Sequence, residues 1–117
     1  MANMLENYYN NKKIKTILGK NSVFNGKLNF KDSLKINGSF IGEINAEGLL
    51  VIGEGAIIQA NISAGSVVVS GTIKGDVTAL EKVEMLPTGR VYGNIKARKV
   101  KISDGVVFNG RCEIIRN

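Results

Sequence analysis

The side chains that could perform chemistry are few in this 117-residue chain. It contains no histidine, which removes the commonest general base and a common metal ligand, and it has one cysteine, Cys112. Glu43 and Asp76 occupy equivalent positions of a repeated segment, so a pair of acidic groups is the first hypothesis. Asn61 takes the same position between them, which would place the two carboxylates about 10 Å apart on an open face. Because an open face neither shifts a pKa nor excludes water, we predict no enzymatic activity, no metal site and no cofactor.

A remote enzymatic alternative is a hexapeptide-repeat acyltransferase, which is also a β-solenoid. Residues 52–57, with the sequence IGEGAI, would pass for one hexapeptide. Against this alternative, the repeats of this chain start 15 to 18 residues apart, which breaks a strict six-residue period. The acyltransferases also need a histidine base, which the chain lacks.

A basic group near the C-terminus raises the question of nucleic-acid binding. It consists of Lys96, Arg98, Lys99 and Lys101. A surface that binds nucleic acid combines such charges with aromatic side chains for stacking, and Tyr92 is the one aromatic residue nearby. We therefore interpret the group as a solvated face and expect no nucleic-acid partner.

The dominant feature of the sequence is a five-residue unit, (Gly/Ala)-x-apolar-x-apolar, that occurs six times. The units start at Gly26, Gly42, Ala60, Gly75, Gly93 and Gly110, with spacings of 16, 18, 15, 18 and 17 residues. Their third positions are Leu28, Ile44, Ile62, Val77, Ile95 and Cys112, and their fifth positions are Phe30, Ala46, Ala64, Ala79, Ala97 and Ile114. The second and fourth positions are all polar, which is the period-2 pattern of a strand with one buried side. We predict that the third and fifth positions form the core ladder, with Cys112 buried in it as a small apolar residue.

Each repeat is too short for a helix pair and suits three short strands joined by tight bends, which is one coil of a parallel β-helix. A second element, apolar-x-apolar, lies between successive units, for example at residues 34–36 and 50–52. The prediction is an all-β, single-domain β-solenoid of about six short coils. We place a flexible N-terminal tail at residues 1–21, the β-helix domain at 22–115 and a short C-terminal end at 116–117.

The residues resemble those of the bactofilin family. The resemblance rests on the segments 42–46, 75–79 and 93–97, with 34–40 between units and 108–110 near the end, and it covers roughly residues 20–115. It implies a right-handed β-helix that polymerises end to end into non-polar filaments without a nucleotide. It also implies a bacterial cytoskeletal role in cell shape, cell-wall synthesis or the placement of envelope and motility machinery, often at the inner face of the membrane.

The two ends of the predicted stack are the candidate self-association surfaces. Bulky residues replace alanine in the fifth-position column at Phe30 and Ile114, and Phe24 and Phe108 also fall in terminal coils. These side chains either fold over the core and seal it, or form the contact between successive subunits. We favour the contact, because soluble solenoids normally carry a polar cap and the sequence shows no capping helix.

The N-terminal tail is the candidate membrane segment. The candidate membrane-binding residues are Met4, Leu5, Tyr8, Tyr9, Lys12 and Lys13. On a helix the first four would share one face, which suits shallow insertion into an anionic membrane surface. The alternative is a solvated, disordered tail, because Asn3, Asn7, Asn10 and Asn11 oppose helix formation.

Together these features predict a self-polymerising bacterial scaffold whose main partner is itself. The further partners we expect are anionic inner-membrane lipid, through the tail, and a cell-wall or motility protein. The single cysteine, the absence of a long apolar run and the lack of a secretory signal favour a cytoplasmic location, peripheral at the inner membrane face. The alternative is an adaptor, monomeric or oligomeric, that binds a cell-envelope enzyme through its flat polar faces.

Overall fold

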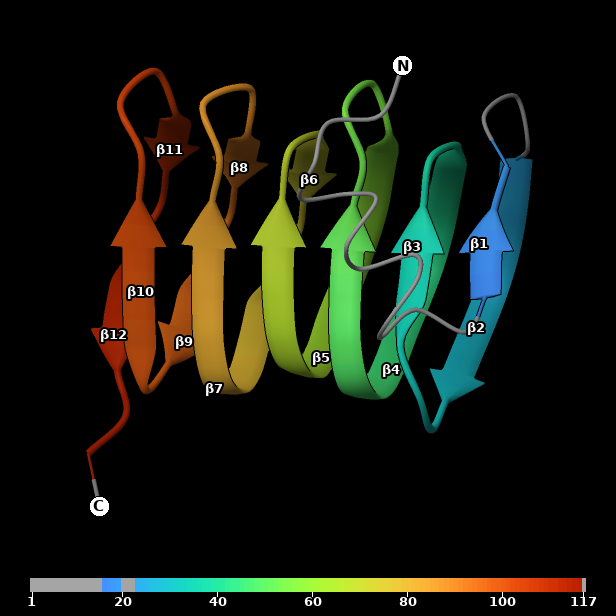
Figure 1. The fold of residues 1–117 in the computed structure, drawn as a ribbon, viewed down its shortest axis with the longest axis horizontal. Helices are drawn as coiled ribbons and strands as arrows, with labels where there is room; N and C mark the ends of the chain where they lie inside the picture. The colour runs from blue at the N-terminus through green and yellow to red at the C-terminus, as the bar shows by residue number, and fades with distance from the viewer. Residues whose placement is uncertain (1–15, 20–22, 117) are drawn as a thin grey trace.

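A computed structural model describes residues 16–19 and 23–116 of the chain, and every regular element in these ranges is a β-strand (Figure 1). The strands are β1 (Thr16–Leu18), β2 (Val23–Phe30), β3 (Leu34–Ile36), β4 (Ser39–Ile52), β5 (Ile57–Val69), β6 (Thr72–Lys74), β7 (Val77–Met85), β8 (Arg90–Tyr92), β9 (Ile95–Ala97), β10 (Lys99–Ile102), β11 (Val107–Asn109) and β12 (Cys112–Ile114). All their pairings are parallel, and each joins equivalent segments of successive coils. The predicted parallel β-solenoid is confirmed.

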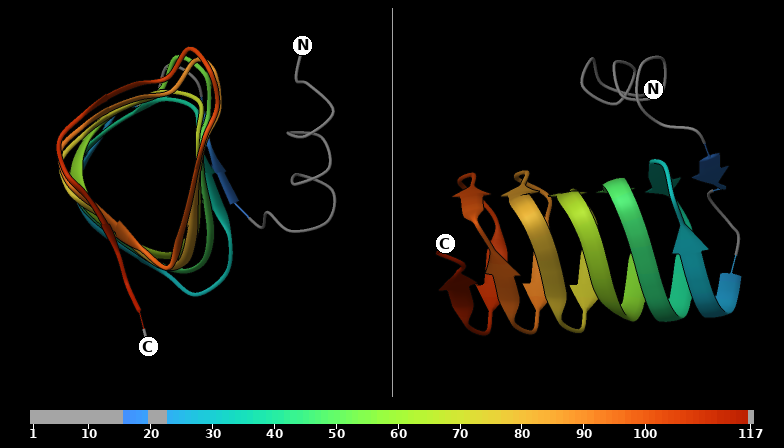
Figure 2. Two further views of the ribbon diagram at one scale, coloured as in Figure 1. Left: turned by 90° about the vertical axis from the view of Figure 1, so that its left-hand side faces the viewer. Right: turned by 90° about the horizontal axis from the view of Figure 1, so that it is seen from below.

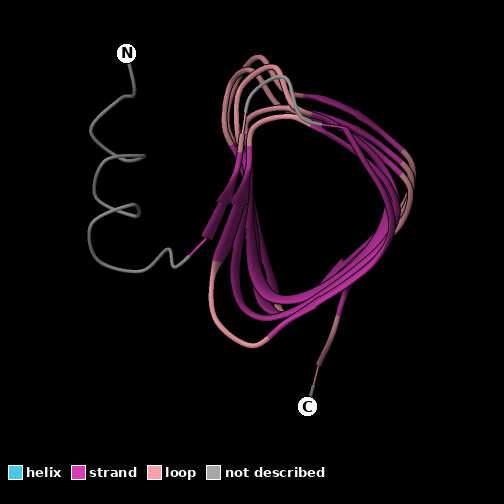
Figure 3. Cartoon of the chain, turned by 90° about the vertical axis from the view of Figure 1, so that its right-hand side faces the viewer, coloured by secondary structure: helices cyan, strands magenta, loops and turns pink. Residues whose placement is uncertain are grey.

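The strands line three faces around a triangular cross-section (Figures 2 and 3). Face A contains residues 16–18, 34–36, 49–52, 66–69, 82–85 and 99–102. Face B contains residues 23–25, 39–41, 57–59, 72–74, 90–92 and 107–109. Face C contains the strand part of each five-residue unit of the repeat, at residues 27–30, 43–46, 61–64, 77–79, 95–97 and 112–114.

The winding is right-handed, as the family resemblance implied. In Figure 1 the strands of face A rise on the near side, the chain descends on the far side, and the coils advance from right to left. Within the described residues six segments stack on each face, so the path from the first to the last completes about five turns. The prediction of about six coils is therefore slightly high when complete turns are counted.

The core is a column of small and branched apolar side chains enclosed by the three faces. The predicted ladder on face C has the expected register, and Ile44, Ala46, Ile62, Ala64, Val77, Ala79, Ile95 and Ala97 are all buried. Leu28 is half-buried and packs against this core. Cys112 pairs with Ile95 as the column requires, but it is exposed, so the prediction of a buried cysteine is wrong. Burial needs a neighbour on both sides, and no further rung of the described chain lies beyond Cys112.

Glycine is required at the corner between faces B and C because the coil beneath comes too close for a side chain. Gly75 has φ of 148° and Gly93 of 149°, a region that L-residues rarely adopt. A Cβ atom on Gly75 would overlap the carbonyl oxygen of Ala60, and one on Gly93 would overlap that of Gly75. Gly26 has a similar φ of 141° but no atom within 4 Å of the Cβ position, because it lies in the first coil of this column.

This difference separates the cost of backbone strain from the cost of stacking. Gly75→Ala introduces both, and we expect it to lower the free energy of unfolding by about 1–3 kcal/mol more than Gly26→Ala, which introduces strain alone. Thermal unfolding of the two full-length variants, followed by circular dichroism, checks this order. Equal losses in the two variants would show that the contact between coils does not dictate the glycine.

Candidate self-association surfaces

The N-terminal end of the stack exposes side chains whose equivalents in the next coil are buried. Phe24 pairs in register with Phe40, yet Phe24 is 43% exposed and Phe40 is 3% exposed. Leu28 and Phe30 head the two core columns of face C, and both are only half-buried. Phe24, Leu28 and Phe30 all lie in β2, which has no further strand on its other side within the described chain, and this explains their exposure.

The C-terminal end has the same character but a different set of side chains. The core columns end at Val100, Ile102, Phe108, Cys112 and Ile114, which stack on the buried Val83, Met85, Val91, Ile95 and Ala97. Ile114 is 43% exposed and Ile102 is 50% exposed, while Phe108 is half-buried against the core. The sequence reasoning missed Ile102, although its place in the last apolar-x-apolar element was a signal for it.

The terminal rungs also leave backbone groups without a partner strand. Among the described strands, β10 pairs with β7 alone, β11 with β8 alone and β12 with β9 alone, whereas β4 and β5 are paired on both sides. An open strand edge presents a row of N–H and C=O groups that another strand can pair with. Each end therefore combines an apolar layer with a template for a further rung.

The four predicted self-association residues fall on these two ends and nowhere else. Phe24 and Phe30 lie in β2 at one end, while Phe108 in β11 and Ile114 in β12 lie at the other. Several stacked coils separate the two pairs, so the structure does not bring them together within one chain (Figure 1). Their role in contacts between copies stays a prediction, which the exposure of the two ends favours.

The polar column that suggested an acidic pair forms a hydrogen-bonded ladder instead. The Asn61 Oδ1 atom accepts from the backbone N–H of Asp76 at 3.3 Å, and Asp76 Oδ1 accepts from the N–H of Asn94 at 3.0 Å. Asn94 Oδ1 continues the series by accepting from the N–H of Arg111 at 3.1 Å. These short side chains fasten each corner to the next coil. Residues 16–19 and 23–116 hold no group of three or more candidate metal ligands.

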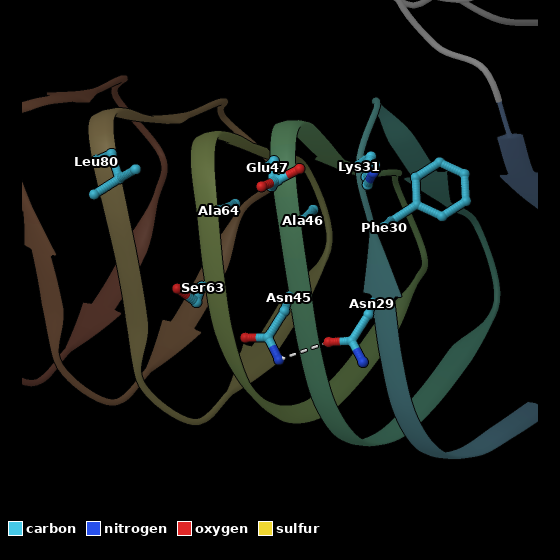
Figure 4. A pocket seen from close by; sticks show the side chains of 9 residues that line it. All are labelled: Asn29, Phe30, Lys31, Asn45, Ala46, Glu47, Ser63, Ala64 and Leu80. Carbon is cyan, nitrogen blue, oxygen red and sulfur yellow. Dashed lines mark hydrogen bonds between the residues drawn. The ribbon is translucent and has the colours of Figure 1, made fainter.

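A shallow groove of about 550 Å³ lies along the corner between faces C and A (Figure 4). It arises because the third coil has one residue fewer at this corner, which shifts the register between Ala64 and Ser66 relative to Ala46 and Leu49. An amide pair borders it, where Asn45 Nδ2 donates to Asn29 Oδ1 at 3.0 Å, and Leu80 stands at its far end with 68% exposure. Sequence reasoning did not find the groove, although the spacing of 15 residues after Ala60 was a signal.

The remaining predicted residues have different outcomes. In the basic group, Lys96 Nζ lies 3.8 Å from Glu113 Oε2, and both side chains are more than half exposed, as expected of a solvated face. The tail residues Met4, Leu5, Tyr8, Tyr9, Lys12 and Lys13 lie outside the described residues, so the membrane hypothesis stays a prediction. Among the described elements, no helix is long and apolar enough to cross a membrane.

The described part of the chain is a short right-handed β-solenoid, and this fold defines the class of protein. Comparison with known families identifies the class more closely. Residues 16–113 match the model of the bactofilin family, described as polymer-forming cytoskeletal. The chain belongs to the bactofilin family.

Individual relatives agree with this assignment. Bactofilin BacP of Myxococcus xanthus is 31% identical over 99 residues, which cover 85% of this chain and 41% of BacP. BacO of the same organism is 30% identical over 99 residues, covering 85% of this chain and 79% of BacO. The chain thus spans about two fifths of BacP. A cryo-EM reconstruction of Thermus thermophilus bactofilin double helical filaments matches with a TM-score of 0.81 and 31% identity, covering 84% of this chain and 97% of that one.

Proposed function

We propose that this bactofilin assembles through its two open ends into nucleotide-independent, non-polar filaments and serves as a scaffold rather than as an enzyme. The observation that carries the proposal is the state of the terminal rungs, where core-column side chains are exposed and strand edges lack a partner. Stacking a second copy on either end continues both the core and the sheet. The double helical filaments of the Thermus thermophilus relative support the formation of filaments by this chain.

A filament without polarity requires contacts between like ends. The N-terminal end presents Phe24 and Phe30, and the C-terminal end presents Ile102, Phe108 and Ile114. An end that meets its own copy forms a two-fold contact in which each side chain is used twice. Alternating two such contacts produces a filament without polarity.

We place the filament in the cytoplasm at the inner face of the membrane, where it organises cell shape, cell-wall or motility machinery. The support is the family assignment together with the sequence of the tail. Apolar Met4, Leu5, Tyr8 and Tyr9 precede Lys12 and Lys13, a combination suited to anionic lipid.

The second candidate function is an adaptor that binds a cell-envelope protein. One observation favours it, the groove of Figure 4 with the exposed Leu80 beside Ala64 and Ala46. A side chain of a partner would find apolar surface there and amide groups at the border. Because the groove lies on the side of the solenoid, a filament and an adaptor can be the same molecule.

The self-association of the C-terminal end is tested by Phe108→Arg. Phe108 packs against the end of the core, so a contact between two ends would bury the new guanidinium group without a partner, at a cost of about 3–5 kcal/mol. We expect a folded protein by circular dichroism that gives short oligomers or monomers in negative-stain electron microscopy and sedimentation velocity.

The matched control is Val107→Arg, which adds the same charge to the neighbouring residue, whose side chain is 40% exposed and faces away from the core. We expect this variant to form filaments as the natural sequence does. Filaments of unchanged length in the Phe108→Arg variant would contradict the assignment of Phe108.

Membrane binding is tested by co-sedimentation with vesicles of anionic or neutral lipid. We expect the full chain to sediment with anionic vesicles and a chain lacking residues 1–11 to bind them much more weakly, because the deletion removes the apolar side chains that would insert into the lipid and leaves only the charge of Lys12 and Lys13. Neutral vesicles should bind the full chain less. Equal binding of the two chains would remove the tail from the membrane contact.

A further inference from the structure

Face A carries apolar side chains on its outer surface, where the alternation of a strand would place polar ones. The residues on either side of Val51 and of Val68 point into the core, so these two valines point out of it. They form a cluster separate from the core, with Leu49 and Leu86 packed against it. We call these four side chains the outer strip.

The two valines of the outer strip are covered. Val51 is 2% exposed and Val68 is 3% exposed, although both face away from the core. Lys35, on the outer side of the preceding rung, is 3% exposed. Outward residues of the same kind on face B are far more open, since Ile41 is 41% and Ile57 45% exposed. The strands and loops of the described ranges form the wall of the solenoid, and none of them crosses outside face A (Figures 2 and 3).

We propose that the outer strip is the docking site of the chain's own N-terminal segment, residues 1–15. The place where the described chain begins supports this occupant, because β1 pairs with β3 and so enters the solenoid on face A itself. Val51 lies two rungs from β1 and Val68 three, which is about 10–15 Å. Fifteen residues span about 22 Å even as a helix, so the segment is long enough.

The chemistry of the segment fits the strip. Its sequence supplies Met4, Leu5, Tyr8 and Tyr9 as apolar groups, followed by lysines. Glu84 pairs with Val68 on the outer side of the next rung and offers a carboxylate at the edge of the strip, where it already lies 3.3 Å from Lys82.

The size of the strip favours a short segment over a second copy of the chain. A stable contact between two proteins buries about 800 Å² on each partner, with roughly 20–30 residues a side. Four apolar side chains make a much smaller surface, and the two valines among them are already covered in a single chain. One short segment of the same chain is large enough to cover this surface, and it needs no contact with a second copy.

Docking gives the tail two competing surfaces. The apolar residues that would pack on the outer strip are the ones proposed to insert into the membrane, so a docked tail is withheld from lipid. This consequence rests on the proposed membrane contact, whereas the docking itself does not. The equilibrium between the two surfaces would set how much of the protein is available to the membrane.

The docking is tested with the full chain in the absence of lipid, by the rate of chymotrypsin cleavage after Tyr8 and Tyr9, followed by mass spectrometry. Val68→Lys places a charge in the centre of the strip without touching the core. We expect it to speed this cleavage about tenfold, because cleavage follows the fraction of undocked tail. Ile57→Lys, the same kind of change on the outside of face B, should cleave at the rate of the natural sequence.

Equal cleavage rates in all three proteins would overturn the proposal. Protection that disappears on dilution would also overturn it, since it would assign the cover to a second copy. If Val68→Lys loses its fold by circular dichroism, Val51→Lys makes the same test one rung away. With anionic vesicles added, we expect Val68→Lys to bind more strongly than the natural sequence. If neither the natural sequence nor any variant binds vesicles, the membrane contact is rejected. The docking proposal is then decided by the cleavage rates alone.

Discussion

Hydrogen bonding from each coil to the next is the interaction on which the rest of this structure depends. All backbone pairing between the strands is parallel and joins neighbouring coils, so a coil by itself has no partner for its N–H and C=O groups. The close approach that this pairing requires leaves no space for a side chain at Gly75, above the carbonyl of Ala60. It also explains why Asn61, Asp76 and Asn94 turn their side chains to the backbone of the following coil. The same pairing has no natural end, which is why the terminal rungs remain open.

Much of this fold could be predicted from the sequence because the repeat constrains every coil in the same way. The alternation around Ile44, Ile62 and Ile95 gave the correct inward columns and the correct register. The predictions failed where a position departs from the average coil. Cys112 belongs to an inward column but not to a buried one, since column membership says nothing of whether a rung lies on both sides.

Two further features lay beyond the pattern for a related reason. The groove beside Leu80 depends on the loss of one residue at a single corner, a local change that the average repeat conceals. Val51 is the middle residue of the apolar-x-apolar element at 50–52 and Val68 of the equivalent element at 67–69, and the alternation of a strand places both outside the core. A buried apolar residue at an outward position, unlike the exposed Ile41 and Ile57, indicates a partner that the repeat itself does not supply. Such positions are therefore where a repetitive sequence carries information beyond its fold.

The open ends and the outer strip act on different scales once copies assemble. In the proposed filament, stacking through the ends would place one tail on every subunit, so tails that bind a surface weakly would act together, and the avidity of the filament would exceed the affinity of any single tail. The reverse also holds, because a tail docked on face A of its own subunit removes one of these contacts without breaking the filament. The proposed assembly through Phe108 and the proposed release of the tail from Val68 would thus be separable steps, since the two surfaces lie on the end and on the side of the same solenoid. On this proposal, a filament that assembles without a nucleotide would still be able to change how strongly it binds a membrane.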